Sequence, residues 1–208
     1  MKTISYAITV HNEIDELTKL LNFLQLHIRK EDEIVIQYDE SSATDEVKEY
    51  LTLMNSMHEN HKVCRFPLNK DFASFKNNLK LHCSKDYIFQ VDADEIPHEY
   101  LVEYLGEVLE TNPVDIVFVP RVNTVEGLEQ SHIDKWKWNV NDKGWVNFPD
   151  YQTRIYKNTE DVTWMNKVHE RITGYDTFSN FPAEEQWSLY HPKKIDRQEK
   201  QNEFYETI

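Results

Sequence analysis

The sequence lacks a hydrophobic run long enough to cross a membrane. Hydrophobic residues make up 39% of the 208 positions, yet no apolar stretch approaches the roughly 20 residues that a transmembrane helix needs. Residues 1–6 carry no signal-peptide pattern and lead directly into an expected strand. We therefore expect a cytoplasmic chain without a transmembrane segment.

Cysteine and positive charge are also scarce. The two cysteines, Cys64 and Cys83, are too few for a disulfide framework and lack metal-site spacing, so we expect free thiols in a reducing compartment. Lys and Arg number 23 against 37 Asp and Glu, which gives a formal net charge of −14. Without a broad basic surface the chain is not expected to bind a nucleic acid. Its acidity is compatible with a site that holds a divalent cation and, through it, an anionic ligand.

Internal repeats, low-complexity tracts and Gly/Ser linkers are absent, so we expect a single domain over residues 1–208. In its first part, short apolar runs alternate with segments of helical spacing, and Asn12 is the expected cap of the first helix. The expected strands cover residues 3–10, 33–38, 62–66, 87–91 and 115–120, and the expected helices cover 14–28, 47–57, 72–79 and 101–109. This alternation is typical of an α/β fold with a parallel sheet flanked by helices. Residues 1–121 are expected to form a nucleotide-binding half.

The alternation stops after residue 121. Residues 122–149 are aromatic and polar, and long irregular connections of this kind are usually functional or mobile. In the remainder, short strands are expected over 151–156, 162–168 and 187–190, followed by a polar helix over 196–207. Residues 122–208 therefore form the second half of the expected domain.

A buried strand that ends in acidic residues is the most informative feature. Residues 87–91 are almost continuously apolar, and Asp92, Asp94 and Glu95 follow them. Side chains at the carboxyl end of such a strand point into the crevice where open α/β sheets bind ligands. Aspartates spaced i, i+2 there can place oxygen ligands around Mg²⁺ or Mn²⁺. The alternative is an acidic turn that caps the next helix, but the position after a buried strand favours a metal site.

Several motifs then occur in a characteristic order. They are Ile8-Thr9-Val10-His11-Asn12-Glu13, Tyr38-Asp39-Glu40-Ser41-Ser42-Ala43-Thr44-Asp45, residues 69–78, Asp92-Ala93-Asp94-Glu95, residues 151–156 and Val168-His169-Glu170. Over about residues 3–195 they resemble family-two glycosyltransferases of the GT-A fold, which has a Rossmann-like sheet. The last two segments are similar to a bacterial branch that builds lipopolysaccharide core and related surface glycans. The sequence departs from the family at Lys70, where glycine is usual, and at Lys76, where arginine is common.

The resemblance implies a metal-dependent, inverting transfer of a sugar from a nucleotide-diphosphate donor, with a UDP-sugar expected. The metal, Mn²⁺ or Mg²⁺, would be bound by Asp92, Asp94 and His191. The expected nucleotide-sugar residues are Thr9, Val10, His11, Asn12, Glu13, Asp39, Phe72, Lys76, Asp92, Ala93 and Asp94. For three of these residues a plainer role stays open. Asp39 can cap the helix that starts at Thr44, Lys76 can be a solvated lysine, and His191 can be a surface histidine before a proline turn.

An inverting transfer also needs a base that takes the proton of the acceptor hydroxyl. The family likeness favours Glu170, and Asp150 is the alternative. The acceptor, a glycan or another hydroxyl compound, is expected on the second half. The residues expected on this acceptor side are Trp136, Trp138, Trp164 and His169, for all of which core packing is the alternative. A hydrolase that uses water as acceptor and a nucleotide-binding protein without turnover stay open, as do the sugar, the acceptor and the oligomeric state.

Overall fold

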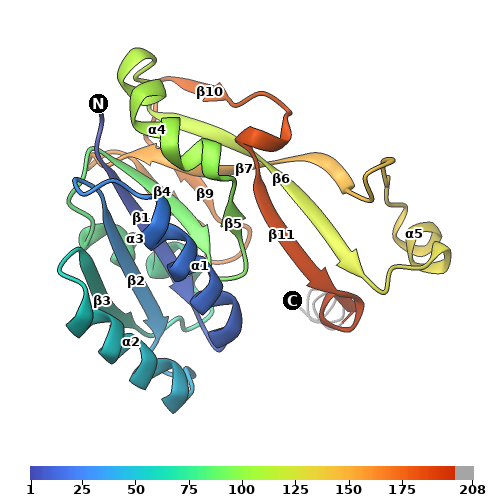
Figure 1. The fold of residues 1–208 in the computed structure, drawn as a ribbon, viewed down its shortest axis with the longest axis horizontal. Helices are drawn as coiled ribbons and strands as arrows, with labels where there is room; N and C mark the ends of the chain where they lie inside the picture. The colour runs from blue at the N-terminus through green and yellow to red at the C-terminus, as the bar shows by residue number, and fades with distance from the viewer. Residues whose placement is uncertain (200–208) are drawn as a thin grey trace.

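One mixed sheet organises the chain, in a computed structural model that describes residues 1–199. The strand order is β3-β2-β1-β4-β7-β6-β11-β5, and β10 also pairs with β6 (Figure 1). The strands of this sheet are β1 (Ile4–Val10), β2 (Glu33–Asp39), β3 (His61–Phe66), β4 (Tyr87–Asp92), β5 (Ile96–Pro97), β6 (Ile116–Glu126), β7 (Val146–Lys157), β10 (Phe178–Asn180) and β11 (Leu189–Lys194). The expected α/β architecture is confirmed.

Helices cover both faces of the part of the sheet formed by β1 to β4. They are α1 (Ile14–His27), α2 (Asp45–Met57), α3 (Phe72–Leu81) and α4 (Glu99–Thr111). Because side chains alternate along a strand, Tyr6 and Ile8 of β1 pack in one core cluster with α1, α2 and α4, whereas Ala7 packs in another with α3. Figure 1 shows α1 and α4 in front of the sheet and α3 behind it.

The second half is more regular than its sequence predicts. Strand β6 continues to Glu126, a short helix α5 (Gln130–Trp136) follows, and β7 already begins at Val146. Strands β6 and β7 form a long antiparallel ribbon, and β7 also runs antiparallel to β4. The expectation of an irregular segment over 122–149 is therefore wrong in part. Backbone hydrogen bonds between the two strands hold the ribbon together. Its sequence lacks the alternation of apolar residues that would predict these strands.

Two further expectations need correction, and a third is tested only in part. The strand expected over 162–168 is only β8 (Thr163–Met165), because it turns to pair with β9 (Arg171–Thr173) in a separate two-stranded sheet. Asn12 does not cap α1, whose N-cap residue is Glu13. The helix expected over 196–207 is helical over residues 195–199, and its remainder lies outside the described residues.

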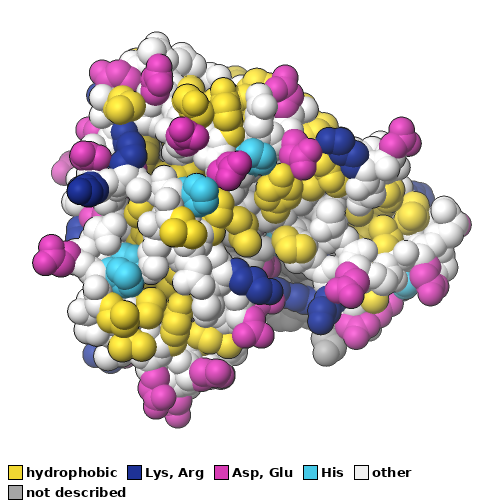
Figure 2. Space-filling model, viewed as in Figure 1, with side chains coloured by type: hydrophobic (Ala, Val, Ile, Leu, Met, Phe, Trp, Pro, Cys, Tyr) yellow, Lys and Arg dark blue, Asp and Glu magenta, His cyan; other side chains and the backbone are white. Residues whose placement is uncertain are grey.

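The surface agrees with the acidic composition. On the face shown in Figure 2, acidic side chains are widely spread, and some Lys and Arg side chains gather near the lower centre while others lie apart at the left and the upper right. Within residues 1–199, none of the helices combines the length and the apolar character that a membrane crossing requires.

Candidate active site

The ends of three parallel strands converge at one edge of the sheet. Thr9 of β1 lies beside Asp92 of β4, and Val10 lies beside Tyr38 of β2. The Thr9 hydroxyl donates a hydrogen bond of 3.0 Å to Oδ1 of Asp92. The residues expected to bind the nucleotide sugar from these strands are therefore brought together.

Asp92 is held by a buried arginine. Nη2 of Arg154, on β7, lies 2.6 Å from Oδ2 of Asp92 and 2.6 Å from Oε1 of the fully buried Glu95. Burial alone would raise the pKa of Asp92, but the charges of Arg154 and Lys76 outweigh it and hold this pKa well below its usual range. Both oxygens of Asp92 thus have protein partners.

Asp94 lies beside His191, as the family resemblance implies. Nε2 of His191 is 3.4 Å from Oδ2 of Asp94, and the same oxygen is 3.1 Å from Nη2 of Arg197. Nδ1 of His191 is 2.7 Å from Oδ1 of Asn123, whose amide nitrogen donates to Asp150. This assignment of the Asn123 amide makes Nδ1 the donor to Asn123, so Nε2 is the ring nitrogen that faces Asp94.

Asp150 is restrained by several donors. Its Oδ2 accepts hydrogen bonds from Nε and Nη2 of Arg121, at 2.9 and 2.7 Å, and from Asn123 at 2.9 Å. Its Oδ1 accepts one from Gln152 at 2.8 Å. Burial raises the pKa of Asp150, but Arg121 and the hydrogen bonds lower it further than burial raises it. A carboxylate with this many donors is a poor proton acceptor.

Glu170 is carried by the loop between β8 and β9. Its Oε1 lies 2.6 Å from Nζ of Lys76, on α3, and this ammonium also lies 4.4 Å from the centre of the Trp164 ring. The carbonyl of Lys167 accepts a hydrogen bond of 2.9 Å from the Phe72 backbone N–H, which attaches the loop to the start of α3. Strand β8 has ended before His169 and Glu170, so alternation along a strand does not force them to opposite faces.

The loop after β1 is fixed to the loop after β2. Oε2 of Glu13 accepts hydrogen bonds of 3.0 Å from the backbone of both His11 and Asn12. Oδ1 of Asn12 accepts one of 2.9 Å from the Thr44 N–H, at the start of α2. The expected nucleotide residues in this loop therefore have defined positions next to the second strand end.

Asp39 shapes its own loop. Its Oδ1 accepts hydrogen bonds of 3.0 Å from the backbone of Ser41 and of Leu68, and its Oδ2 accepts one from the Ser42 hydroxyl. Burial raises the pKa of Asp39, and these hydrogen bonds lower it below its usual value. The cap of α2 is Thr44 itself, so the alternative that Asp39 caps this helix does not hold.

The expected acceptor-side tryptophans do not form one surface. Trp136 and Trp138 pack on each other at 4.6 Å, and Figure 1 shows α5 at the far end of the β6–β7 ribbon, away from β2 and β3. Trp164 is buried and donates a hydrogen bond of 3.2 Å to the Tyr156 hydroxyl. Core packing, the alternative, therefore describes Trp164.

Sequence reasoning gave no role to the residues that link the acids. Arg154 pairs with Asp92 and Glu95, and Arg121 joins Glu95 to Asp150 through a contact of 3.1 Å between its Nη1 and Oε1 of Glu95. One signal was available in the sequence, because an arginine in a strand that is otherwise buried requires carboxylate partners.

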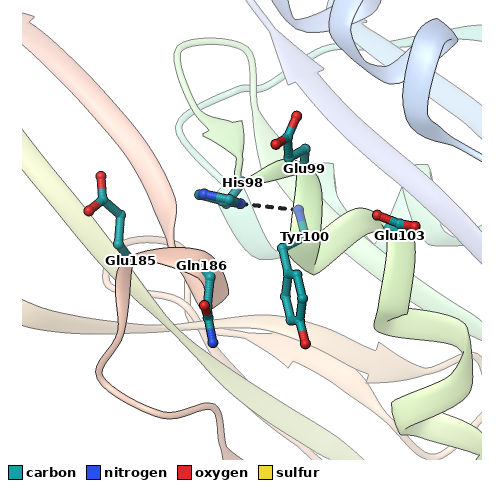
Figure 3. Close-up of a pocket in the computed structure, with 6 residues that line it drawn as sticks. All are labelled: His98, Glu99, Tyr100, Glu103, Glu185 and Gln186. Carbon is teal, nitrogen blue, oxygen red and sulfur yellow. Dashed lines mark hydrogen bonds between the residues drawn. The ribbon is translucent and has the colours of Figure 1, made fainter.

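A separate pocket of about 300 Å³ lies at the start of α4. Its lining residues are His98, Glu99, Tyr100, Glu103, Glu185 and Gln186 (Figure 3). His98 caps α4 by accepting a hydrogen bond of 3.1 Å from the Tyr100 N–H. None of the residues expected to act on the donor or the acceptor lines this pocket.

The family model described as glycosyl transferase family 2 matches residues 5–187. The chain belongs to glycosyl transferase family 2. A comparison with curated protein sequences found no match.

Solved structures agree on the fold of this family-two chain. The TarS 1-349 fragment of S. aureus superposes with a TM-score of 0.62 at 15% sequence identity, over 92% of this chain and 60% of that one. The same fragment in complex with UDP-GlcNAc gives a TM-score of 0.62 at 16% identity, over 93% of this chain and 59% of that one. At such identity the likeness shows the GT-A type of α/β fold. The chain spans about 60% of the length of the TarS fragment.

Proposed function

We propose that this family-two chain is a metal-dependent, inverting glycosyltransferase that uses a UDP-sugar and a hydroxyl acceptor. The observation that carries the proposal is the Asp94–His191 pair at the edge where β1, β2 and β4 end. TarS, which shares the fold at low identity, has been solved with UDP-GlcNAc. That complex supports a uridine nucleotide as the first donor to test.

The Asp94–His191 pair has the chemistry of a divalent-metal site. Oδ1 of Asn123 accepts a hydrogen bond from Nδ1 of His191, and a metal-binding histidine is commonly oriented by such a partner. Within residues 1–199 no three His, Cys, Asp or Glu side chains form a complete ligand group. Mg²⁺ and Mn²⁺ sites often take only one or two protein ligands and complete their shell with substrate phosphates and water. We therefore assign Asp94 and His191 as ligands of Mn²⁺ or Mg²⁺, and Asp92 as a residue held in place by Arg154.

The bound metal would stabilise the charge that develops on the diphosphate leaving group. In the proposed reaction the acceptor oxygen bonds to the anomeric carbon as the bond from this carbon to the diphosphate oxygen breaks. The diphosphate leaves with the electron pair, and Glu170 takes the acceptor proton. The Glu13 and Asp39 loops would hold the nucleoside.

The two expected halves would have different binding roles, although they share one sheet. Strand β7, from the second half, lies between β4 and β6 in the same sheet. We assign donor binding to residues 1–121 and acceptor binding to residues 122–208, with Glu170 contributed by the latter.

The test compares nucleotide binding and turnover. Calorimetry with UDP, GDP and ADP, each with Mn²⁺ and with EDTA, should show metal-dependent binding and a preference for UDP. Equal affinity for the three nucleotides would contradict a uridine donor, and full affinity in EDTA would contradict metal dependence. Release of UDP from UDP-sugars is then measured with candidate glycans. Release at the same rate with and without every glycan would instead indicate a hydrolase, and binding without any release would indicate a nucleotide-binding protein.

A further inference from the structure

Lys76 lies between the donor side and the acceptor side of the site. Its Nζ contacts Oε1 of Glu170 at 2.6 Å, and the two side chains are only 8% and 19% exposed. Its positive charge also acts on Asp92, at the end of β4. Lys76 therefore interacts with the proposed base, Glu170, and with Asp92, which lies beside the proposed position of the diphosphate.

The surroundings of Lys76 allow its ammonium to change partner. The ring of Trp164, over which Nζ lies at 4.4 Å, is buried in the core and so provides a fixed apolar platform. A lysine carries its three donors on a flexible four-carbon stem. The loop that carries Glu170 is irregular, with positive φ angles at Asn166 and His169, and lies between two strands of three residues each.

A nucleoside diphosphate would compete with Glu170 for this cation. Its phosphates carry more negative charge than one carboxylate, and lysine is a common phosphate ligand. The start of α3 follows the carboxyl end of β3, so it lies at the same edge of the sheet.

We propose that Lys76 exchanges partners, from Glu170 in the free protein to the diphosphate in the donor complex. Glu170 is thereby released to accept the proton of the acceptor hydroxyl only after the donor has bound. Lys76 is a positioning residue for the base as well as a phosphate ligand. The proposal rests on the proposed function and adds an order of events to it.

A zero-length crosslinker tests the exchange directly. A carbodiimide joins an amine and a carboxylate that are in contact, and mass spectrometry identifies the joined peptides. The Lys76–Glu170 crosslink should form in the free protein and fall by roughly tenfold with saturating UDP and Mn²⁺, as for an exchange that favours the diphosphate by about 1.4 kcal/mol. The Lys62–Glu33 pair, also 2.6 Å long but at the opposite edge of the sheet, is the internal control and should not change.

Variants supply an independent measurement. Lys76→Gln should bind UDP about ten- to a hundredfold more weakly, the range for a lost hydrogen bond to a charged group. Lys76→Gln should also lower thermal stability, because Glu170 loses its cation. The double variant Lys76→Gln/Glu170→Gln removes both charges, so it should regain that stability while UDP binding stays weak. The control is Lys80→Gln, which lies one turn further along the same helix and is also buried. It should lower thermal stability and leave UDP affinity unchanged.

The outcomes separate this proposal from the proposed function. If UDP binds and the Lys76–Glu170 crosslink forms to the same extent with and without it, the pair is static and the exchange is wrong. Recovery of UDP affinity together with stability in the double variant would also overturn it, as would a failure of the crosslink to form in the free protein while the control crosslink forms. If no nucleotide binds to the parent protein, the proposed function fails instead.

Discussion

Nε2 of His191 lies 3.4 Å from Oδ2 of Asp94, and the other ring nitrogen of the histidine faces Asn123 at 2.7 Å. The contact with Asn123 orients the histidine ring so that its other nitrogen faces Asp94. Because Nδ1 donates to Asn123, Nε2 is the ring nitrogen beside the carboxylate, an arrangement that suits a divalent cation.

Removal of either proposed ligand should abolish the effect of metal on UDP binding. We expect Asp94→Ala and His191→Ala to bind UDP equally in Mn²⁺ and in EDTA. Asn123→Ala, which removes the orienting partner, should weaken Mn²⁺ binding by about ten- to a hundredfold. Calorimetric titration of Mn²⁺ in the presence of UDP measures both effects. The control is Asn158→Ala, which removes amide hydrogen bonds to Cys83 and Lys85, and a similar loss there would contradict the site.

Replacement of the proposed base should affect turnover much more than binding. Glu170→Gln is expected to lower kcat by roughly 10² to 10⁴, the range for a lost general base, with metal-dependent UDP binding retained. Asp150→Asn should lower kcat less, because Arg121, Asn123 and Gln152 already occupy its oxygens. The turnover of each variant, measured at saturating UDP-sugar, shows which of the two acids is the base. A parent rate in Glu170→Gln with a large loss in Asp150→Asn would transfer the role to Asp150.

Arg154 should be essential for stability as well as for the site. Arg154→Met leaves Asp92 and the buried Glu95 without their shared cation. Loss of one partner of a buried charged group costs about 3–5 kcal/mol of unfolding free energy. Urea unfolding at pH 7 measures this loss. The exposed Arg65–Glu40 pair offers the control, since Arg65→Met should cost about 1 kcal/mol or less, and equal losses in the two variants would contradict the prediction.

His61 should make the fold less stable in mild acid. Burial, reinforced by the neighbouring His58, lowers the pKa of His61 from 6.5 to about 4, and within residues 1–199 neither ring nitrogen has a hydrogen-bond partner. As the pH falls below 6.5 the unfolded chain takes up a proton that the folded chain refuses, so stability declines until about pH 4. His61→Phe should reduce this decline by up to about 3 kcal/mol. Urea unfolding at pH 7, 5.5 and 4 tests the sign, and parallel pH profiles for parent and variant would refute it.

The nucleotide-binding half was largely predictable from local patterns. Residues 87–91 are apolar except for Gln90, a pattern typical of a strand covered on both sides, and β4 has this position. Leu17, Leu21 and Leu24 recur at helical spacing, and all three are buried on α1. Such signals suffice to define each strand and helix from its own residues.

Partner choice in the second half was not predictable in this way. The sequence indicated a strand over 151–156, but not that β7 would run antiparallel between β4 and β6. That position takes Arg154 to Asp92 and Asp150 to Arg121. The position of Trp164 was not predictable either, because an aromatic side chain suits a sugar-binding surface as well as a core. Packing of β8 against α3 places it in the core.

The sequence by itself determined the α/β alternation, the buried strand that ends in Asp92 and Asp94, and the residue types that can bind a metal. The tertiary structure alone decided which cation serves which acid: Arg154 holds Asp92, and Lys76 holds Glu170. The physical reason is that periodicity and capping act over a few residues. An ion pair depends on the distance between two charged atoms, and only the packing of segments far apart in the chain sets that distance.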